Sequence, residues 1–441
     1  GLLGLSLALF RERLYADSAY YAARVILSEG FWVEHSRIIL VFSQWLPLLA
    51  VKLQLPLRVV LIAYSVGHVL FFYLLFLGLN KGLKHREAGY FLLLLQTMGI
   101  LHGFFTPMFE LYYGAGLLVA FWVIWENKAP RGAWLALLLV LALLILLSHP
   151  MSLLLLLFVL AFHALMLGPR SWRVYLALGA LMLAVLVFKS QTASAYEQGK
   201  SQAFVHTLAS GEFVYLFRGD YLRGLGAFLL RCYADLLLLW LLGLGWLLYR
   251  RKPLAAALLA LAFVGLLAMV NVSHRGFAHT RYQEQVYFPL IVVVAGAAVM
   301  GCMPLLDAAW RRRMALAVLA LVFLRLALIA QSSQAFTRRV EYMQALAAPA
   351  QPGSKFWLPA AAWDPAVLEP NWSLPIESLL LSGLKGPAHA LSICTDEDLD
   401  FERNRDRLGA DRFLFRRWDI LPDSAANMRY FRLAPGPYRQ L

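Results

Sequence analysis

Long apolar stretches alternate with short polar turns along most of the chain. About 20 apolar residues in a helix cross a bilayer, because a helix satisfies its own backbone hydrogen bonds. The pattern therefore predicts an all-α polytopic membrane protein. We expect spans near 57–79, 89–108, 113–125, 132–148, 150–168, 173–190, 226–249, 254–272, 286–306 and 314–331. We also expect residues 1–10 to be the outer half of a first span that begins before residue 1.

Basic residues indicate which side of the membrane each turn faces. At least two Lys or Arg occur in each of the turns 80–87, 126–132, 168–173, 249–253 and 307–313. Cytoplasmic loops are enriched in these residues, so we place the five turns in the cytoplasm. Alternation then requires that 38–54 does not cross. This segment is short and contains Pro47 and Lys52, which favours an interfacial helix on the outer face.

The resulting topology has about eleven transmembrane helices. It places outside the cytoplasm the residues 11–56, 109–112, 191–225, 273–285 and everything after about 332. The pattern changes in 336–441, where short apolar runs alternate with polar turns. We therefore divide the chain into a transmembrane domain, 1–335, and a small extracytoplasmic α/β or α+β domain, 336–441. The long outer loop 191–225 is interpreted either as a lid or as a plain amphipathic hairpin.

Composition agrees with the pattern, since 61% of residues are hydrophobic and the mean hydropathy is +0.65. A net charge of +14 would suggest a nucleic-acid partner in a soluble protein. Here much of the charge lies in the short turns, so it indicates topology, and no nucleic acid is expected as a partner. Three cysteines exclude a disulfide framework and a CxxC metal site.

Two carboxylates stand out against this background. Asp17 follows the first apolar run, and Glu110 follows the predicted span at 89–108. On the predicted topology both face the outer compartment. Acids near a membrane are costly and tend to mark function. Asp17 and Glu110 are therefore the leading functional candidates.

Short motifs occur around these acids in a definite order. Residues 17–24 read DSAYYAAR and residues 30–33 read GFWV, a Thr-Pro pair precedes Glu110, and Arg281 and Tyr282 precede Pro289. In this order the chain resembles the GT-C superfamily of membrane glycosyltransferases, especially the protein mannosyltransferase and aminoarabinose transferase branch. The resemblance covers roughly residues 5–335 in architecture.

The chain departs from the family pattern at three places. Ser18 stands where a second acid is usual, Met108 occupies the usual acidic position near Glu110, and residues 34–37 replace a Pro-rich stretch. These departures put the identity of the donor and the acceptor in question. They also leave open that the chain is a divergent or inactive member of the superfamily.

The resemblance implies a GT-C-like fold and a specific reaction. A sugar would pass from a polyprenyl-phosphate donor to a glycan, lipid or protein acceptor. Transfer would occur at the outer face of a bacterial-type inner membrane, and the lipid bilayer would be a further partner.

Such a transfer needs a general base for the acceptor hydroxyl and cations for the leaving phosphate. We expect Asp17 to be the base, with Glu110 as its partner or orienting acid. The alternative for Asp17 is a helix N-cap before residues 18–27. The alternative for Glu110 is a solvated acid at a span end.

For the phosphate, Arg281 leads, with Tyr282 beside it, because a guanidinium can bind two phosphate oxygens. The alternative is an interfacial arginine whose charge reaches toward water. His149 either contacts the donor phosphate or orients an acid, or it only caps the turn before Pro150. The remaining substrate-binding candidates are the outer-loop residues Glu34, His35, Arg37 and His279.

No HxxxH or HExxH spacing occurs in the sequence, so ligand spacing does not support a divalent metal, although it leaves one possible, and no cofactor is assigned. The competing class is a non-catalytic membrane protein, either a transporter or a scaffold whose tail binds a partner. A transporter should have two halves with matching broken helices. No such paired halves are visible in the sequence.

Overall fold

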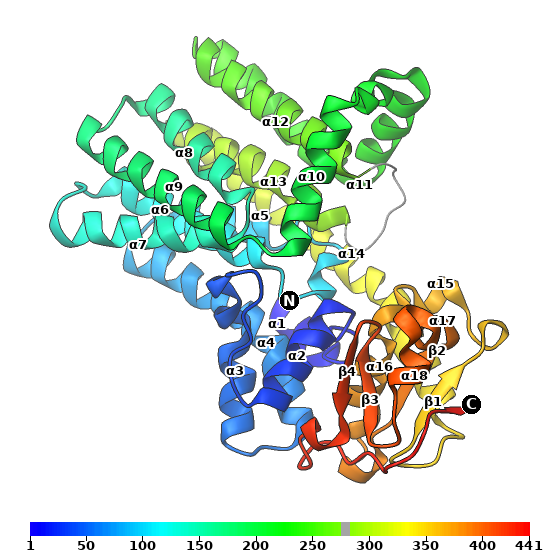
Figure 1. The fold of residues 1–441 in the computed structure, drawn as a ribbon. Coiled ribbons are helices and arrows are strands. Elements are labelled where there is room, and N and C mark those ends of the chain that lie inside the picture. The colour runs from blue at the N-terminus through cyan, green and yellow to red at the C-terminus, as the bar shows by residue number, and fades with distance from the viewer. Residues whose placement is uncertain (275–282) are drawn as a thin grey trace.

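The computed structural model describes residues 1–274 and 283–441 (Figure 1). Helices make up 74% of the described residues, which confirms the predicted helical class. The helices of the long apolar part are α1 (Leu2–Ala8), α2 (Asp17–Ser28), α3 (Val41–Lys52), α4 (Leu57–Leu77), α5 (Arg86–Leu95), α6 (Glu110–Asn127), α7 (Gly132–Ser148), α8 (Ser152–Leu167), α9 (Trp172–Thr192), α10 (Ala195–Ala209), α11 (Gly219–Tyr249), α12 (Pro253–Ser273), α13 (Gln283–Gly296) and α14 (Ala308–Ala347).

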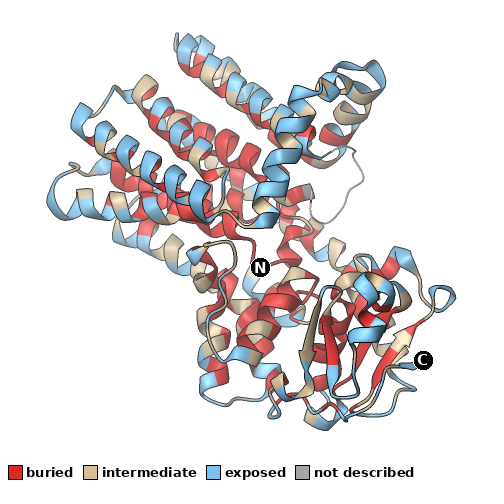
Figure 2. Ribbon diagram, in the orientation of Figure 1, coloured by how far each residue is buried: buried red, intermediate tan, exposed pale blue. Residues whose placement is uncertain are grey.

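Six helical segments in the described ranges are long and apolar enough to cross a membrane. They are Leu57–Gly82, Trp172–Thr192, Gly219–Tyr249, Pro253–Ser273, Glu284–Leu305 and Ala308–Ala347. Trp172–Thr192 buries only 22% of its most apolar stretch against protein, whereas Glu284–Leu305 buries 89%. Figure 2 shows the same contrast between the largely exposed α9 and the buried α6. Apolar faces of this kind fit lipid, so the chain is an integral membrane protein.

The predicted span at 89–108 was wrong as a single helix. α5 ends at Leu95, and residues 96–109 are irregular apart from a 3-10 turn at Gly103–Phe105. One carboxylate oxygen of Glu284 accepts the backbone N–H groups of His102 and Gly103, each at 2.7 Å. The chain can leave the helix here because a side chain satisfies donors that helix carbonyls would otherwise satisfy.

The segments predicted to lie outside the spans contain helices of their own. The 38–54 segment forms a short 3-10 turn, Ile38–Leu40, followed by α3. The 191–225 segment contains α10 and a 3-10 helix at Glu212–Phe217, and it leads directly into α11. A capping box between Ser194 and Glu197 fixes the start of α10.

The C-terminal region carries all the strands of the described residues. Its elements are β1 (Lys355–Leu358), α15 (Pro365–Leu368), α16 (Leu374–Gly383), β2 (Ser392–Thr395), α17 (Asp396–Asp400), α18 (Asn404–Arg407), β3 (Arg412–Arg416), β4 (Asp419–Pro422) and β5 (Arg439–Gln440). β1 lies between β2 and β5 and is parallel to both, while β3 and β4 form an antiparallel pair.

The C-terminal region shares a hydrophobic core with the start of the chain. One cluster of buried side chains includes Tyr20 and Ile26 of α2, Leu61 of α4, Leu379 of α16 and Phe415 of β3. α14 continues without a break from its apolar part to Ala347 and enters the same region (Figure 1). The strands therefore pack against residues 11–56, the first segment predicted to lie outside the membrane and called here the first outer segment, and this packing brings distant residues close to Asp17.

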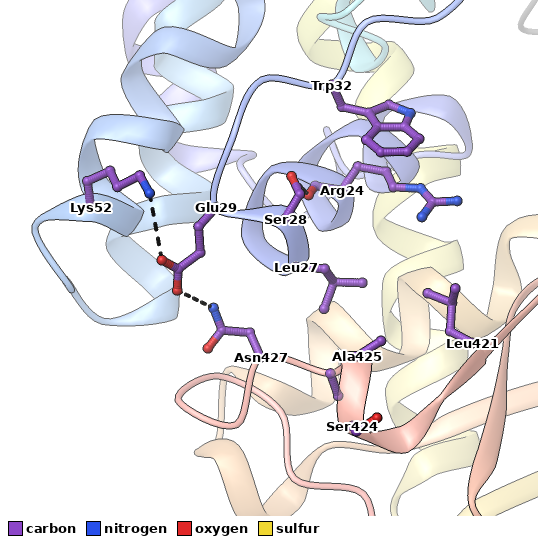
Figure 3. Close-up of a pocket in the computed structure, with 11 residues that line it drawn as sticks. Arg24, Leu27, Ser28, Glu29, Trp32, Lys52, Leu421, Ser424, Ala425 and Asn427 are labelled. Atoms are coloured by element: carbon purple, nitrogen blue, oxygen red, sulfur yellow. Dashed lines mark hydrogen bonds and ion pairs between the residues drawn. The ribbon is translucent and has the colours of Figure 1, made fainter.

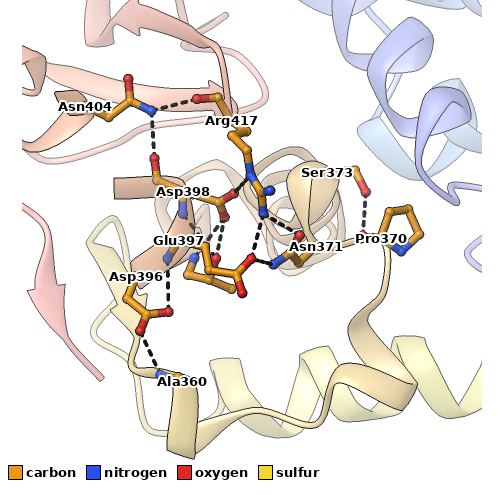
Figure 4. Close-up of polar contacts among 10 residues, drawn as sticks. Ala360, Pro370, Asn371, Ser373, Asp396, Glu397, Asp398, Asn404 and Arg417 are labelled. Carbon is orange, nitrogen blue, oxygen red and sulfur yellow. Dashed lines mark hydrogen bonds and ion pairs between the residues drawn. The ribbon is translucent and has the colours of Figure 1, made fainter. Parts of the chain in front are cut away.

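A polar network inside the C-terminal region fixes α17 (Figure 4). Arg417 Nε donates to Asp398 Oδ1 at 2.7 Å, and its Nη2 donates to Glu397 Oε2 at 3.2 Å. Asn404 Nδ2 bonds the backbone oxygens of Asp398 and Arg417 at 2.7 and 2.6 Å. Asp398 is fully buried, so loss of Arg417 would leave a buried carboxylate without its cation.

Candidate functional site

Asp17 is the first residue of α2. The N-cap is Ala16, and no side-chain hydrogen bond caps the helix, so the N-cap interpretation of Asp17 was wrong. The Asp17 side chain is half-buried. Within the described part of the chain, no hydrogen bond or ion pair reaches its carboxylate. A carboxylate in this state is free to accept a proton from a ligand.

Two further carboxylates affect the protonation of Asp17. Burial, together with the nearby carboxylates of Glu110 and Glu34, raises the pKa of Asp17 from its ordinary value of 3.8 to about 6. Arg416 and Lys200 oppose the shift. A base with a pKa somewhat below neutral is charged at pH 7 yet takes up a proton readily.

Glu110, the first residue of α6, forms a buried ion pair with Arg37. Arg37 Nη1 lies 2.9 Å from Glu110 Oε1, and Arg37 Nη2 lies 3.4 Å from Glu197 Oε1 of α10. The side chains of Arg37 and Glu110 are 13% and 4% exposed. One guanidinium thus joins the first outer segment, α6 and the 191–225 segment. The Glu110 carboxylate is therefore engaged by Arg37 and is not a solvated acid at a span end.

Glu34 lies at the centre of an aromatic and basic group. It accepts hydrogen bonds from Tyr20 Oη, from Trp32 Nε1 at 3.3 Å and from Tyr21 Oη at 3.4 Å. Arg416 of β3 lies 3.7 Å from Glu34 Oε1. Glu34 is therefore held between α2 and the C-terminal region.

His35 connects the first outer segment to α10. Its ring stacks on Tyr196 with centroids 5.3 Å apart, and its Nδ1 lies 2.9 Å from Ser194 Oγ. Lys200 of the same helix lies over the Tyr196 ring at 4.4 Å. The 191–225 segment thus contacts the candidate site through α10.

His149 makes the turn-capping contact that was one of its two interpretations. Its Nδ1 accepts the backbone N–H of Met151 at 3.2 Å. Burial lowers its pKa well below the ordinary value, and Arg37, Lys189 and Lys200 lower it further. The ring is therefore neutral at pH 7, and it lies within the electrostatic reach of three cations.

The remaining sequence candidates, Arg281, Tyr282 and His279, lie outside the described residues. The structure adds residues that the sequence did not single out for the site: Glu197, Lys189 and Arg416. Arg416 is 399 positions from Asp17 in the sequence, so spacing along the chain gave no signal for it. Lys189 had a weak signal, because it is a basic residue at the outer end of a predicted span.

A cleft of about 650 Å³ opens at the C-terminal end of α2 (Figure 3). Arg24, Trp32 and Glu29 line one wall, and Glu29 contacts Asn427 at 3.0 Å across it. Arg24 lies seven residues after Asp17, about 10 Å along the helix. Arg24 Nε donates to Tyr20 Oη at 3.2 Å, so hydrogen bonds connect this wall to Glu34.

Among residues 1–274 and 283–441, no group of three or more His, Cys, Asp or Glu side chains could hold a metal ion. The acids near Asp17 thus form no metal-ligand set within these ranges. The positive charges near Asp17 in the described residues come from basic side chains, such as Lys200 and Arg416.

No family model, curated protein or solved structure matches this chain. The resemblance to the GT-C superfamily therefore depends on the sequence motifs alone.

Proposed function

We propose that the chain is a GT-C-like membrane glycosyltransferase that moves a sugar from a polyprenyl-phosphate donor to an acceptor at the outer face of the membrane. One observation carries the proposal. The carboxylate of Asp17 has no hydrogen-bond or ion-pair partner among residues 1–274 and 283–441, and it lies among acids and cations contributed by the first outer segment, the 191–225 segment and the C-terminal region. A scaffold has no need for an unpaired, half-buried acid, which costs stability.

The topology that goes with this proposal has about eleven spans. The site and the C-terminal region lie outside the cytoplasm of a bacterial-type inner membrane. This arrangement suits the chemistry, since a polyprenyl-linked donor at the outer leaflet presents its phosphate at the membrane surface.

In the proposed reaction, the acceptor oxygen attacks the anomeric carbon of the donor. Its proton passes to Asp17, and the bond from the anomeric carbon to the phosphate oxygen breaks with both electrons going to the phosphate. Asp17 later returns the proton to water. The developing phosphate charge needs cations, and Arg37, Lys189 and Lys200 are the described candidates. Arg281 and Tyr282 join this set through the family resemblance.

The test measures release of polyprenyl phosphate from a panel of polyprenyl-phosphate sugars, with native membranes as the source of acceptor. Asp17→Asn should lower release by about 10²-fold or more, the scale of a lost general base. Asp220→Asn is the matched control, because Asp220 is an exposed acid of the 191–225 segment. Wild-type release by Asp17→Asn would exclude Asp17 as the base. An intact wild type that neither releases nor binds polyprenyl phosphate would favour the scaffold.

A further inference from the structure

The backbone immediately before Asp17 has an unusual conformation. Ala16 has φ 50° and ψ −114°, a region that favours glycine because a Cβ atom is crowded there. Ala16 is fully buried. A non-glycine residue keeps such a conformation only when its surroundings hold it there, and such positions cluster at functional sites.

A carboxylate from the C-terminal region holds the Ala16 backbone in this conformation. Glu377 of α16 accepts the backbone N–H of Ala16 through Oε1 at 3.1 Å. The same oxygen accepts from Ser373 Oγ at 2.6 Å. Glu377 and Ser373 are 2% and 0% exposed, so water does not compete for these bonds.

Arg339 of α14 fixes Glu377 in turn. Its Nε and Nη2 donate to the two carboxylate oxygens at 2.8 and 2.9 Å, a bidentate arrangement. Its guanidinium also lies over the ring of Tyr15, 5.2 Å from the centroid. The two residues that precede Asp17 are therefore held by one ion pair that lies far away in the sequence.

We propose that Glu377 is a positioning residue for Asp17, holding the Ala16 peptide in its positive-φ conformation so that α2 begins with the Asp17 carboxylate directed into the site. This inference rests on the proposed role of Asp17 as general base. A misplacement of a reacting group by about 1 Å can cost about 10²-fold in rate. Release of the Ala16 N–H should therefore lower kcat more than it changes KM.

Glu377→Asp tests the proposal with little disturbance. The shorter side chain keeps a negative charge for Arg339, and it withdraws its oxygens from the Ala16 N–H. We expect kcat for polyprenyl-phosphate release to fall by about 10- to 100-fold per folded molecule. The acid limb of the kcat/KM profile should move to lower pH, because a displaced Asp17 leaves the carboxylates that raise its pKa. Adding Ala16→Gly should restore part of the rate, since glycine adopts this φ without strain.

Asp398→Asn is the matched control, because it breaks a buried carboxylate–arginine pair of the same region. The Asp398 carboxylate bonds Thr395 and Arg417 of the C-terminal region. Asp398→Asn should lower thermal stability and leave kcat and the pH profile unchanged. If Glu377→Asp behaves like Asp398→Asn, Glu377 is only structural. If Glu377→Asp fails to accumulate, Ser373→Ala is the second test, because Ser373 bonds the same oxygen of Glu377. A wild-type kcat and pH profile in Ser373→Ala would also overturn the proposal.

Asp17→Asn, measured beside these variants, separates the two claims. An inactive Asp17→Asn with a wild-type-like Glu377→Asp rejects only the positioning role. An active Asp17→Asn rejects the base itself.

Discussion

Replacing Asp17 by Asn should stabilise the folded protein at neutral pH while it lowers transfer by about 10²-fold or more. The folded-state pKa of Asp17 is about 6, against an ordinary value of 3.8. The charged carboxylate is therefore disfavoured in the folded state, and asparagine removes that penalty. A helix cap would behave differently, since asparagine caps as well as aspartate and would leave stability unchanged.

The magnitude follows from the size of the pKa shift. One pKa unit corresponds to about 1.4 kcal/mol, so the shift amounts to at most about 3 kcal/mol of lost stability above pH 6. A folded-state pKa above the unfolded value means that the folded protein binds more protons between pH 3.8 and 6. The penalty is accordingly absent below pH 3.8 and grows as pH rises to about 6.

The assay is the apparent thermal midpoint of the detergent-purified protein, measured from pH 4 to pH 8 for wild type and Asp17→Asn. We expect the variant to melt a few degrees higher at pH 7.5 and the difference to shrink toward pH 4. Asp220→Asn again serves as control and should show no such pH-dependent gain. Equal midpoints at pH 7.5, or a difference that does not change with pH, would refute the assignment of a penalised carboxylate at Asp17.

Three other predictions concern the ion pairs, the topology and the phosphate. Arg37→Ala should cost about 3–5 kcal/mol of stability, because it leaves the buried Glu110 without its cation, and Arg37→Lys should cost less; equal melting of both variants and wild type would contradict this. Single cysteines at the exposed positions Ser28 and Ala361, in a chain lacking its native cysteines, should both react with an impermeant reagent outside intact cells; labelling of only one would reject the topology. Arg281→Ala should weaken polyprenyl-phosphate binding more than Arg281→Lys does, with little change in thermal midpoint, and equal affinities would remove Arg281 from the site.

Periodicity and hydropathy predicted the helices well where each helix satisfies its own backbone. The span expected at 57–79 is α4, and the expected interfacial segment 38–54 contains α3. The prediction failed at 89–108, where Gly99 and Gly103 interrupt an otherwise apolar run. There a distant carboxylate, Glu284, replaces the helix carbonyls as acceptor, and hydropathy averaged over a window contains no such information.

The candidate site was predictable to the extent that it comes from one stretch of sequence. Asp17, Glu34 and Arg37 lie within the first outer segment, and Glu110 was the other acid at a predicted outer span end. The pairing of Arg37 with both Glu110 and Glu197 depends on how α6 and α10 pack. No spacing along the sequence indicates that Arg37 pairs with these two acids, because the pairing arises only when the helices pack together.

The C-terminal region was predicted to be a domain of its own, and its side chains contact the candidate site. Arg416 lies near Glu34, and Glu377 bonds the backbone beside Asp17. The ion pair of Glu377 with Arg339 is fully desolvated, so either partner alone would be a buried, unpaired charge. Such a pair makes the packing of the C-terminal region against the first outer segment cooperative. A partly opened interface would expose both charges to water and separate them. The conformation of the chain at Asp17 therefore depends on the C-terminal region being in place, and this dependence links folding of the outer region to the competence of the proposed base.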